Sequence, residues 1–280
     1  MRLILLTVLT MVAFAANSVL NRLGVGGGAI GPQAFAVVRL ASGALTLAVL
    51  VGFRHWLAGG AVWPGWPGRL AGVAGLLTYL FGFSIAYQQL SAGTGALVLF
   101  GAVQITMFAG AIWAAEAIAP RRWVGAGLAF AGLCLLVAPQ VTQAGAFAIA
   151  AMALAGFGWG VYSLAGRRAA DALAATAWNF GLALPLALCI WGTTGWAGLH
   201  TATAPGIALA VLSGAVTSGL GYALWYRLLP DLGATRAAVA QLSVPVIAAA
   251  GGFALIGEGL TLRFVLSALI VLCGVALASR

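Results

Sequence analysis

Ten apolar runs, most of them close to 20 residues long, follow one another along the chain with only short connections. A helix needs about 20 apolar residues to cross the hydrocarbon core of a bilayer. The pattern therefore predicts an all-α integral membrane protein with ten transmembrane helices and no separate soluble domain. The expected spans are approximately 3–22, 33–53, 70–90, 93–114, 123–139, 145–165, 173–195, 205–228, 234–256 and 262–279.

The charged residues are too few to cover a soluble surface. They make up 6% of the chain, against 63% hydrophobic residues, whereas a soluble domain carries about 25%. The net charge of +9 comes from arginines that stand singly or in pairs, so it indicates no nucleic-acid partner. Cys134, Cys189 and Cys273 lie in separate apolar runs, where we expect buried side chains. Without catalytic or metal-binding motifs, we predict no enzyme activity, no metal and no cofactor.

The arginines also predict an orientation, because short cytoplasmic loops are enriched in positive charge. With a cytoplasmic N-terminus, ten arginines fall on the cytoplasmic side and three, Arg22, Arg39 and Arg263, on the other. The first 18 residues resemble a secretion signal, but removing them would leave nine spans and break this pattern. We therefore retain the first helix and expect both termini in the cytoplasm.

An internal repeat divides the chain into two halves, 1–142 and 143–280, each of five helices. A shift of 142 residues pairs Glu116 with Glu258, and a shift of 139 pairs GFSIAY (82–87) with GYALWY (221–226). Further pairs at the shift of 142 are Gly110–Gly252, Arg121–Arg263, Ala126–Ala268, Gly132–Gly274 and Leu135–Leu277. Because five is odd, the second half enters the membrane from the opposite side, as in the inverted repeats of many secondary transporters.

Glu116 and Glu258 each end an apolar run and precede an arginine by five residues. A carboxylate at such a position can accept hydrogen bonds from the free N-terminal amides of the next helix. We expect this structural role for both glutamates. A role in carrying protons is the alternative.

Two stretches with the pattern E-x4-R-x4-A-x5-G, Glu116–Gly132 and Glu258–Gly274, resemble the EamA family of the drug/metabolite transporter superfamily, as does PQAFAVVRLASGAL (32–45). The resemblance covers essentially the whole chain and is greatest to YddG-type aromatic amino acid exporters of bacterial inner membranes. It implies ten helices, a central cavity and alternating access. One departure is Gly181, which stands where the repeat would place a second copy of Arg39.

Polar and aromatic residues within the spans are the candidates for a substrate site, because unpaired polar groups are costly in hydrocarbon. Asn17 and Trp159 occupy equivalent places in the two halves, within segments rich in glycine and alanine. Pro245 interrupts its helix beside two polar residues. The predicted substrate-binding residues are Asn17, Tyr79, Phe83, Trp159, Thr217, Gln241 and Ser243. Packing between helices is the alternative role for each of them.

Three further residues are expected near the ends of helices. Arg39 lies one to two turns into its span, and its side chain can extend to the interface or attract substrate carboxylates at the mouth of the cavity. We favour extension of the side chain to the interface. Tyr87 and Tyr226 lie closer to the ends of their spans, where we expect interfacial anchors.

These features predict an exporter of small metabolites, foremost aromatic and other neutral amino acids, in a bacterial inner membrane. Every acidic residue falls at the end of a span, so we expect facilitated diffusion rather than proton coupling. The alternative is an exporter of another metabolite or drug with the same architecture, with or without proton coupling. The expected partners are a small-molecule substrate and the lipid bilayer, with the protein a monomer or weak homodimer.

Overall fold

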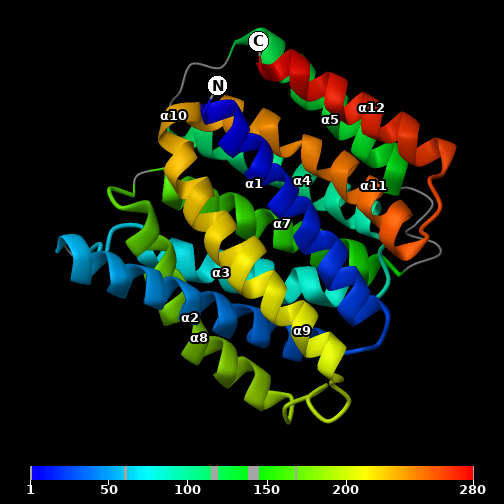
Figure 1. Cartoon of the computed structure of the whole chain (residues 1–280). Helices are drawn as coiled ribbons and strands as arrows, with labels where there is room; N and C mark the ends of the chain where they lie inside the picture. The colour runs from blue at the N-terminus through cyan, green and yellow to red at the C-terminus, as the bar shows by residue number, and fades with distance from the viewer. Residues whose placement is uncertain (1, 60–61, 115–118, 138–144, 168, 280) are drawn as a thin grey trace.

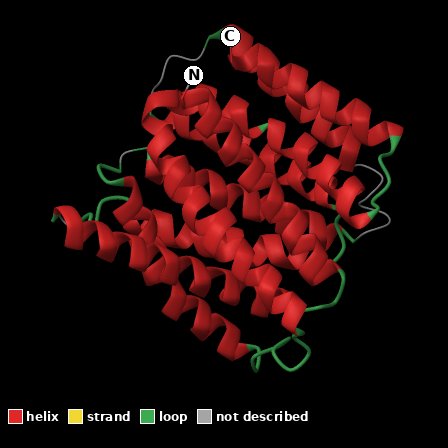
Figure 2. Ribbon diagram, in the orientation of Figure 1, coloured by secondary structure: helices red, strands yellow, loops and turns green. Residues whose placement is uncertain are grey.

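The computed structural model describes residues 2–59, 62–114, 119–137, 145–167 and 169–279, and all regular structure in these ranges is helical (Figure 2). The first half contains α1 (Arg2–Asn21), α2 (Pro32–Ala58), α3 (Arg69–Ala86), α4 (Ala92–Trp113) and α5 (Pro120–Val137). The second contains α7 (Ala146–Gly166), α8 (Ala172–Thr193), α9 (Ala204–Leu212), α10 (Gly221–Gln241), α11 (Ser243–Ile256) and α12 (Leu262–Ser279). Two π-helical segments, η1 (Arg22–Gly26) and η2 (Ser213–Leu220), continue α1 and join α9 to α10.

The ten expected spans all correspond to apolar helices of the structure. Seven are long and apolar enough to cross a membrane, and three shorter apolar helices cover Trp123–Gly132, Ser243–Ile256 and Leu262–Gly274 within the described residues. The predicted all-α membrane fold is therefore confirmed.

The connection expected between the spans 205–228 and 234–256 was placed wrongly. The segment LPDLGA (229–234) carries the Pro and Gly of a typical loop, yet it is helical and belongs to α10. The helix break lies later, at Leu242, three residues before Pro245. Proline costs less in a membrane helix because neighbouring groups satisfy the freed backbone carbonyl.

The helices pack in a pattern that relates the two halves (Figure 1). Helix α3 packs on α7, and η2 and α10, which correspond to α3 in the second half, pack on α1. In the same way, α4 contacts α7, and its counterpart α11 contacts α1. The pairs α5–α12, α4–α11 and α2–α8 join equivalent helices directly. This is the arrangement that a two-fold relation between five-helix halves would give, although the boundary at residue 142 lies outside the described residues.

Small residues allow these helices to approach closely. A methyl group on Gly158 of α7 would lie 2.6 Å from the carbonyl oxygen of Gly75 on α3. Large apolar side chains instead cover the outside of the bundle, as expected for a surface in contact with lipid. Cys134, Cys189 and Cys273 are among the exposed residues, contrary to expectation, because hydropathy alone does not show which face of a helix meets lipid.

Candidate functional site

A cluster of aromatic side chains fills the centre of the bundle, where α1, α3, α7 and α10 meet. Trp159 of α7 is its hub: its ring centroid lies 5.2 Å from that of Phe14, 5.1 Å from Tyr79 and 4.6 Å from Tyr222. We call the following residues, all buried, the central aromatic cluster: Phe14, Tyr79, Phe83, Trp159, Tyr162, Tyr222 and Trp225.

The orientation of the Trp159 ring is set by a hydrogen bond. Its indole Nε1 donates to Oε1 of Gln241 at 2.7 Å, and the Gln241 amide nitrogen lies 3.8 Å from the Met107 sulfur. On one side the ring stacks on Tyr162, with an interplanar angle of 22°. The position of Gln241 at the end of α10, beside the helix break, brings its amide into the bundle centre.

A polar network borders the cluster, centred on Asn17 of α1. Its Oδ1 accepts hydrogen bonds from three hydroxyls of η2, those of Ser213, Thr217 and Ser218, and its Nδ2 donates to the Thr217 carbonyl at 3.1 Å. The segment SGAVTSGL is rich in glycine and hydroxyl residues, and such residues offer the backbone alternatives to regular α-helical bonding. Isolated π-helical turns are frequent at functional sites.

Arg39 lies between these two groups and is wholly buried, so the expected extension to the interface is wrong. Its Nε donates to Ser218 Oγ at 2.8 Å, and its Nη2 donates to the hydroxyls of Tyr79 at 2.8 Å and Tyr222 at 2.5 Å. The guanidinium also lies over the rings of Tyr79 and Phe83, 5.2 and 5.1 Å from their centroids. Because this face of α2 packs on α3 and η2, the side chain has no path to solvent.

The cluster encloses a cavity of only about 10 Å³. That volume holds one water molecule at most. Its walls are Phe14, Asn17, Tyr79, Phe83, Leu99, Phe100, Trp159 and Tyr222. The structure is therefore closed at its centre.

The structure brings together six of the seven predicted substrate-binding residues. Four of them, Asn17, Tyr79, Phe83 and Trp159, line the central cavity. Thr217 is hydrogen-bonded to Asn17, and Gln241 is hydrogen-bonded to Trp159. Ser243 is the exception, because its hydroxyl donates to the Ala240 carbonyl at 2.7 Å, across the helix break at Leu242.

Several cluster residues were not predicted. Tyr222 corresponds to Phe83 in the GFSIAY–GYALWY pairing, so the repeat itself carried the signal. Phe14 lies three residues before Asn17 and therefore on the same helix face. The partners of Trp225 depend on packing that the sequence does not show.

Tyr87 and Tyr226 are buried, so they are not interfacial anchors. The Tyr226 hydroxyl donates to the Tyr162 carbonyl at 2.9 Å, and the Tyr87 hydroxyl donates to the Ala92 carbonyl at 3.2 Å. Tyr87 is the C-cap of α3 and so lies at a helix end as predicted, whereas Tyr226 lies within α10, which continues to Gln241; both side chains are buried in the bundle.

Glu258 joins three segments at one end of the bundle. Its carboxylate accepts hydrogen bonds from Arg22 Nε at 3.0 Å and from the Ala92 amide at 2.8 Å. It therefore serves a helix N-terminus as expected, but that of α4 rather than of the following helix α12. The chain turns at Gly257, in the left-handed region with φ of 72°, and this directs Glu258 across the bundle. Glu116 lies outside the described residues.

The opposite end has its own ion pair, between Arg54 of α2 and Asp171, the residue preceding α8. Both carboxylate oxygens accept from the guanidinium, at 2.9 and 2.6 Å, and Oδ1 also accepts from the Ala174 amide at 3.0 Å. The hydrogen bonds from Arg54 lower the pKa of the Asp171 carboxyl from its ordinary value, with burial acting in the opposite direction.

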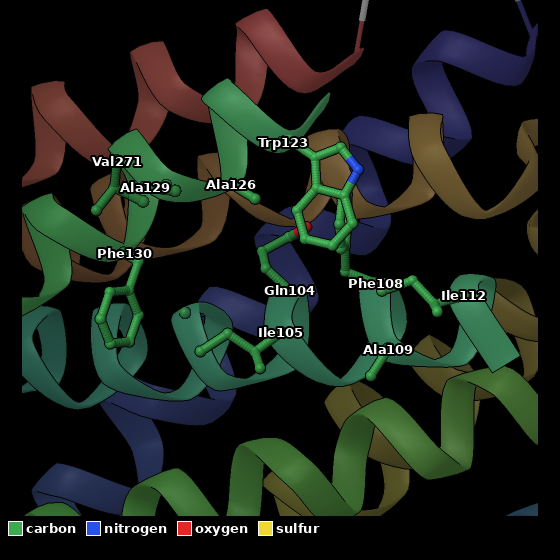
Figure 3. A pocket seen from close by; sticks show the side chains of 12 residues that line it. Gln104, Ile105, Phe108, Ala109, Ile112, Trp123, Ala126, Ala129, Phe130 and Val271 are labelled. Carbon is green, nitrogen blue, oxygen red and sulfur yellow. The ribbon is translucent and has the colours of Figure 1, made fainter. Parts of the chain in front are cut away.

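A larger cavity, of about 470 Å³, lies between α4, α5 and α12 (Figure 3). Its lining is apolar except for Gln104, and its walls include Ile105, Trp123 and Phe130, all exposed on the outside of the bundle. A groove of this character suits lipid chains better than a polar solute. Among the described residues no group of three His, Cys, Asp or Glu side chains could hold a metal ion.

These features define a multi-pass membrane protein with a polar and aromatic centre enclosed by its helices. The chain belongs to the EamA-like transporter family, whose model matches residues 146–280. Family membership makes it a membrane transporter of small solutes.

An uncharacterized protein of Pseudomonas aeruginosa is 44% identical over 276 residues, covering 99% of this chain and 94% of that protein. A crystal structure of another protein is similar with a TM-score of 0.69 at 18% identity, covering 96% of both chains, and supports the fold alone.

Proposed function

We propose that this transporter exports aromatic and other neutral amino acids from the bacterial cytoplasm, through the central cavity and by alternating access. The observation that carries the proposal is the central aromatic cluster itself. An aromatic substrate can stack on Trp159, Tyr79 and Phe14, and each such contact contributes about 0.5–1.5 kcal/mol beyond area burial. The bordering network around Asn17 supplies hydroxyl and amide groups for the polar part of an amino acid.

The closed centre supports alternating access. A cavity of about 10 Å³ cannot hold an amino acid, so substrate must enter after the helices separate at one end. Two five-helix halves that enter the membrane from opposite sides, with both ends of the chain in the cytoplasm, would give a direct route to two such openings.

The distribution of carboxylates supports facilitated diffusion. Among the described residues, Asp171 and Glu258 lie at helix ends, Asp231 lies within α10 and is exposed, and none of the three lines the central cavity. Coupling to protons usually requires a titratable group in the path through the membrane. The substrate gradient alone would then drive transport.

The test uses purified protein in liposomes, with uptake of radiolabelled tryptophan and threonine measured with and without a pH gradient. We expect saturable tryptophan flux that threonine competes with and that is independent of the gradient. Trp159→Phe should reduce tryptophan flux about two- to tenfold, because the indole contact and the Gln241 hydrogen bond are both lost.

Trp113→Phe is the matched control, because Trp113 is 93% exposed at the end of α4 and should leave flux unchanged. Flux driven by the pH gradient would replace facilitated diffusion with proton coupling. Absence of flux for every amino acid would favour another metabolite or drug, and flux that does not saturate would indicate a channel.

A further inference from the structure

Arg39 is a buried cation with no anionic partner among the described residues. The ion pairs in that part of the chain are Arg22–Glu258 and Arg54–Asp171, at the two ends of the bundle. The Arg39 side chain instead meets three hydroxyl oxygens and two aromatic rings. The charge is solvated by neutral groups only.

One part of the guanidinium lacks even a neutral partner. Nη1 of Arg39 is buried and makes no hydrogen bond, although Nε and Nη2 are fully engaged. A buried charge without compensation is costly, and a buried donor without an acceptor adds to that cost. Ionisable groups in this situation within membrane proteins commonly mark the path of a substrate.

The position of Arg39 gives this charge access to the central cavity. The hydroxyls of Tyr79 and Tyr222 both accept from its Nη2, and both residues line the cavity. The guanidinium is therefore directly behind two hydroxyls on the cavity wall. When the cavity widens, an anionic group between these tyrosines is within reach of two phenol donors and of the guanidinium.

We propose that Arg39, with Tyr79 and Tyr222, forms the subsite for the carboxylate of the transported molecule. Arginine suits this role because its planar fork can bind both carboxylate oxygens. The inference rests on the proposed use of the central cavity and narrows its substrates to compounds with a carboxylate. Trp159 and Phe14, which also line the cavity, then contact the apolar part.

A purely structural role for Arg39 and a role in binding the carboxylate predict opposite effects when the guanidinium is removed. If the guanidinium only ties α2 to α3 and η2, its removal should lower the thermal stability and leave ligand affinity intact. If it is an uncompensated charge kept for a ligand, Arg39→Met should keep or raise the melting temperature and abolish recognition of carboxylates. The hydroxyls left behind can bond to each other, since Tyr222 already donates to Tyr79 at 3.0 Å.

The experiment measures binding to the purified protein by calorimetry, and stability by circular dichroism during heating. The probes are tryptophan, tryptophanamide, which lacks the carboxylate, and indole-3-propionate, which lacks the amine. We expect the wild type to bind the two carboxylates at least about tenfold more tightly than the amide, a difference of about 1.4 kcal/mol. Arg39→Met should lose this preference, and Arg39→Lys should keep part of it.

Arg263→Met is the matched control, because Arg263 is exposed and donates to the Leu135 carbonyl far from the cavity. It should retain the preference. Equal binding of tryptophan and tryptophanamide would overturn the subsite while leaving amino acid transport intact. Binding of indole-3-propionate but not tryptophan, lost in Arg39→Met, would support the subsite and refute amino acid transport. Failure of both carboxylates to bind, or undiminished binding to Arg39→Met, would overturn the subsite.

Discussion

Asp171 combines two stabilising roles that substitutions can separate. Its carboxylate accepts from the Ala174 amide as the N-cap of α8, and it pairs with Arg54. Asp171→Ala removes both and should lower the free energy of unfolding by about 1–2 kcal/mol, most of it from the cap. Asp171→Asn keeps the cap and loses only the ion pair, which is partly exposed, so we expect a loss below about 1 kcal/mol. Unfolding of the two variants in detergent micelles measures these losses of stability. Equal losses in Asp171→Ala and Asp171→Asn would contradict the assignment of most of the effect to the cap.

Asp171 should also make the stability of the protein depend on pH. The folded pKa of Asp171 is lowered, so its contribution to stability is present above its ordinary pKa and is lost as the pH falls through the folded value. The melting temperatures of the wild type and Asp171→Asn should differ at neutral pH and converge below about pH 4. A difference that persists or grows in acid would show that another interaction of Asp171 is responsible.

At the scale of elements, the crossing of α3 and α7 depends on the absence of side chains at Gly75 and Gly158. A Cβ on Gly158 would meet the Gly75 carbonyl at 2.6 Å and the Tyr79 amide at 2.8 Å. Gly158→Ala should therefore destabilise the protein by about 1–3 kcal/mol, because two backbones must separate. It should also weaken tryptophan binding, since both helices carry cluster residues.

Gly181→Ala is the matched control in α8, where a Cβ would meet nothing within 4 Å. There alanine should be neutral or stabilise the helix by about 1 kcal/mol. The midpoints of thermal unfolding compare the two variants. If both variants lose stability equally, the close crossing is not the cause of the loss at Gly158.

These elements also show how far the sequence predicts the structure. Hydropathy is a local property, so the ten spans and the depth of Arg39 could be predicted from single runs. The direction of a side chain depends on which helix packs beside it, and Arg39, Tyr87 and Tyr226 were placed wrongly for that reason. The repeat carries some of the missing information, because the pairing of Phe83 with Tyr222 points to a cluster residue that no local pattern indicates.

At the scale of the whole molecule, the closed centre lies between two polar contacts. Helix α2 runs back from the end where α1 finishes, so Arg54–Asp171 and Arg22–Glu258 lie at opposite ends of the bundle (Figure 1). In the alternating access proposed above, opening of either end of the bundle would separate the segments that the contact at that end joins. Each ion pair should therefore stabilise closure of its own end.

This can be tested by thiol labelling of the cavity wall. The three exposed cysteines are first replaced by serine, and Leu99→Cys then places a single thiol on the buried wall of the cavity. In sealed vesicles, Glu258→Gln should increase labelling by a membrane-impermeant reagent several-fold, from one side of the membrane only. Asp171→Asn should increase labelling from the other side, because it releases the opposite end. Equal labelling from both sides, or no change in either variant, would show that these ion pairs do not control access to the centre.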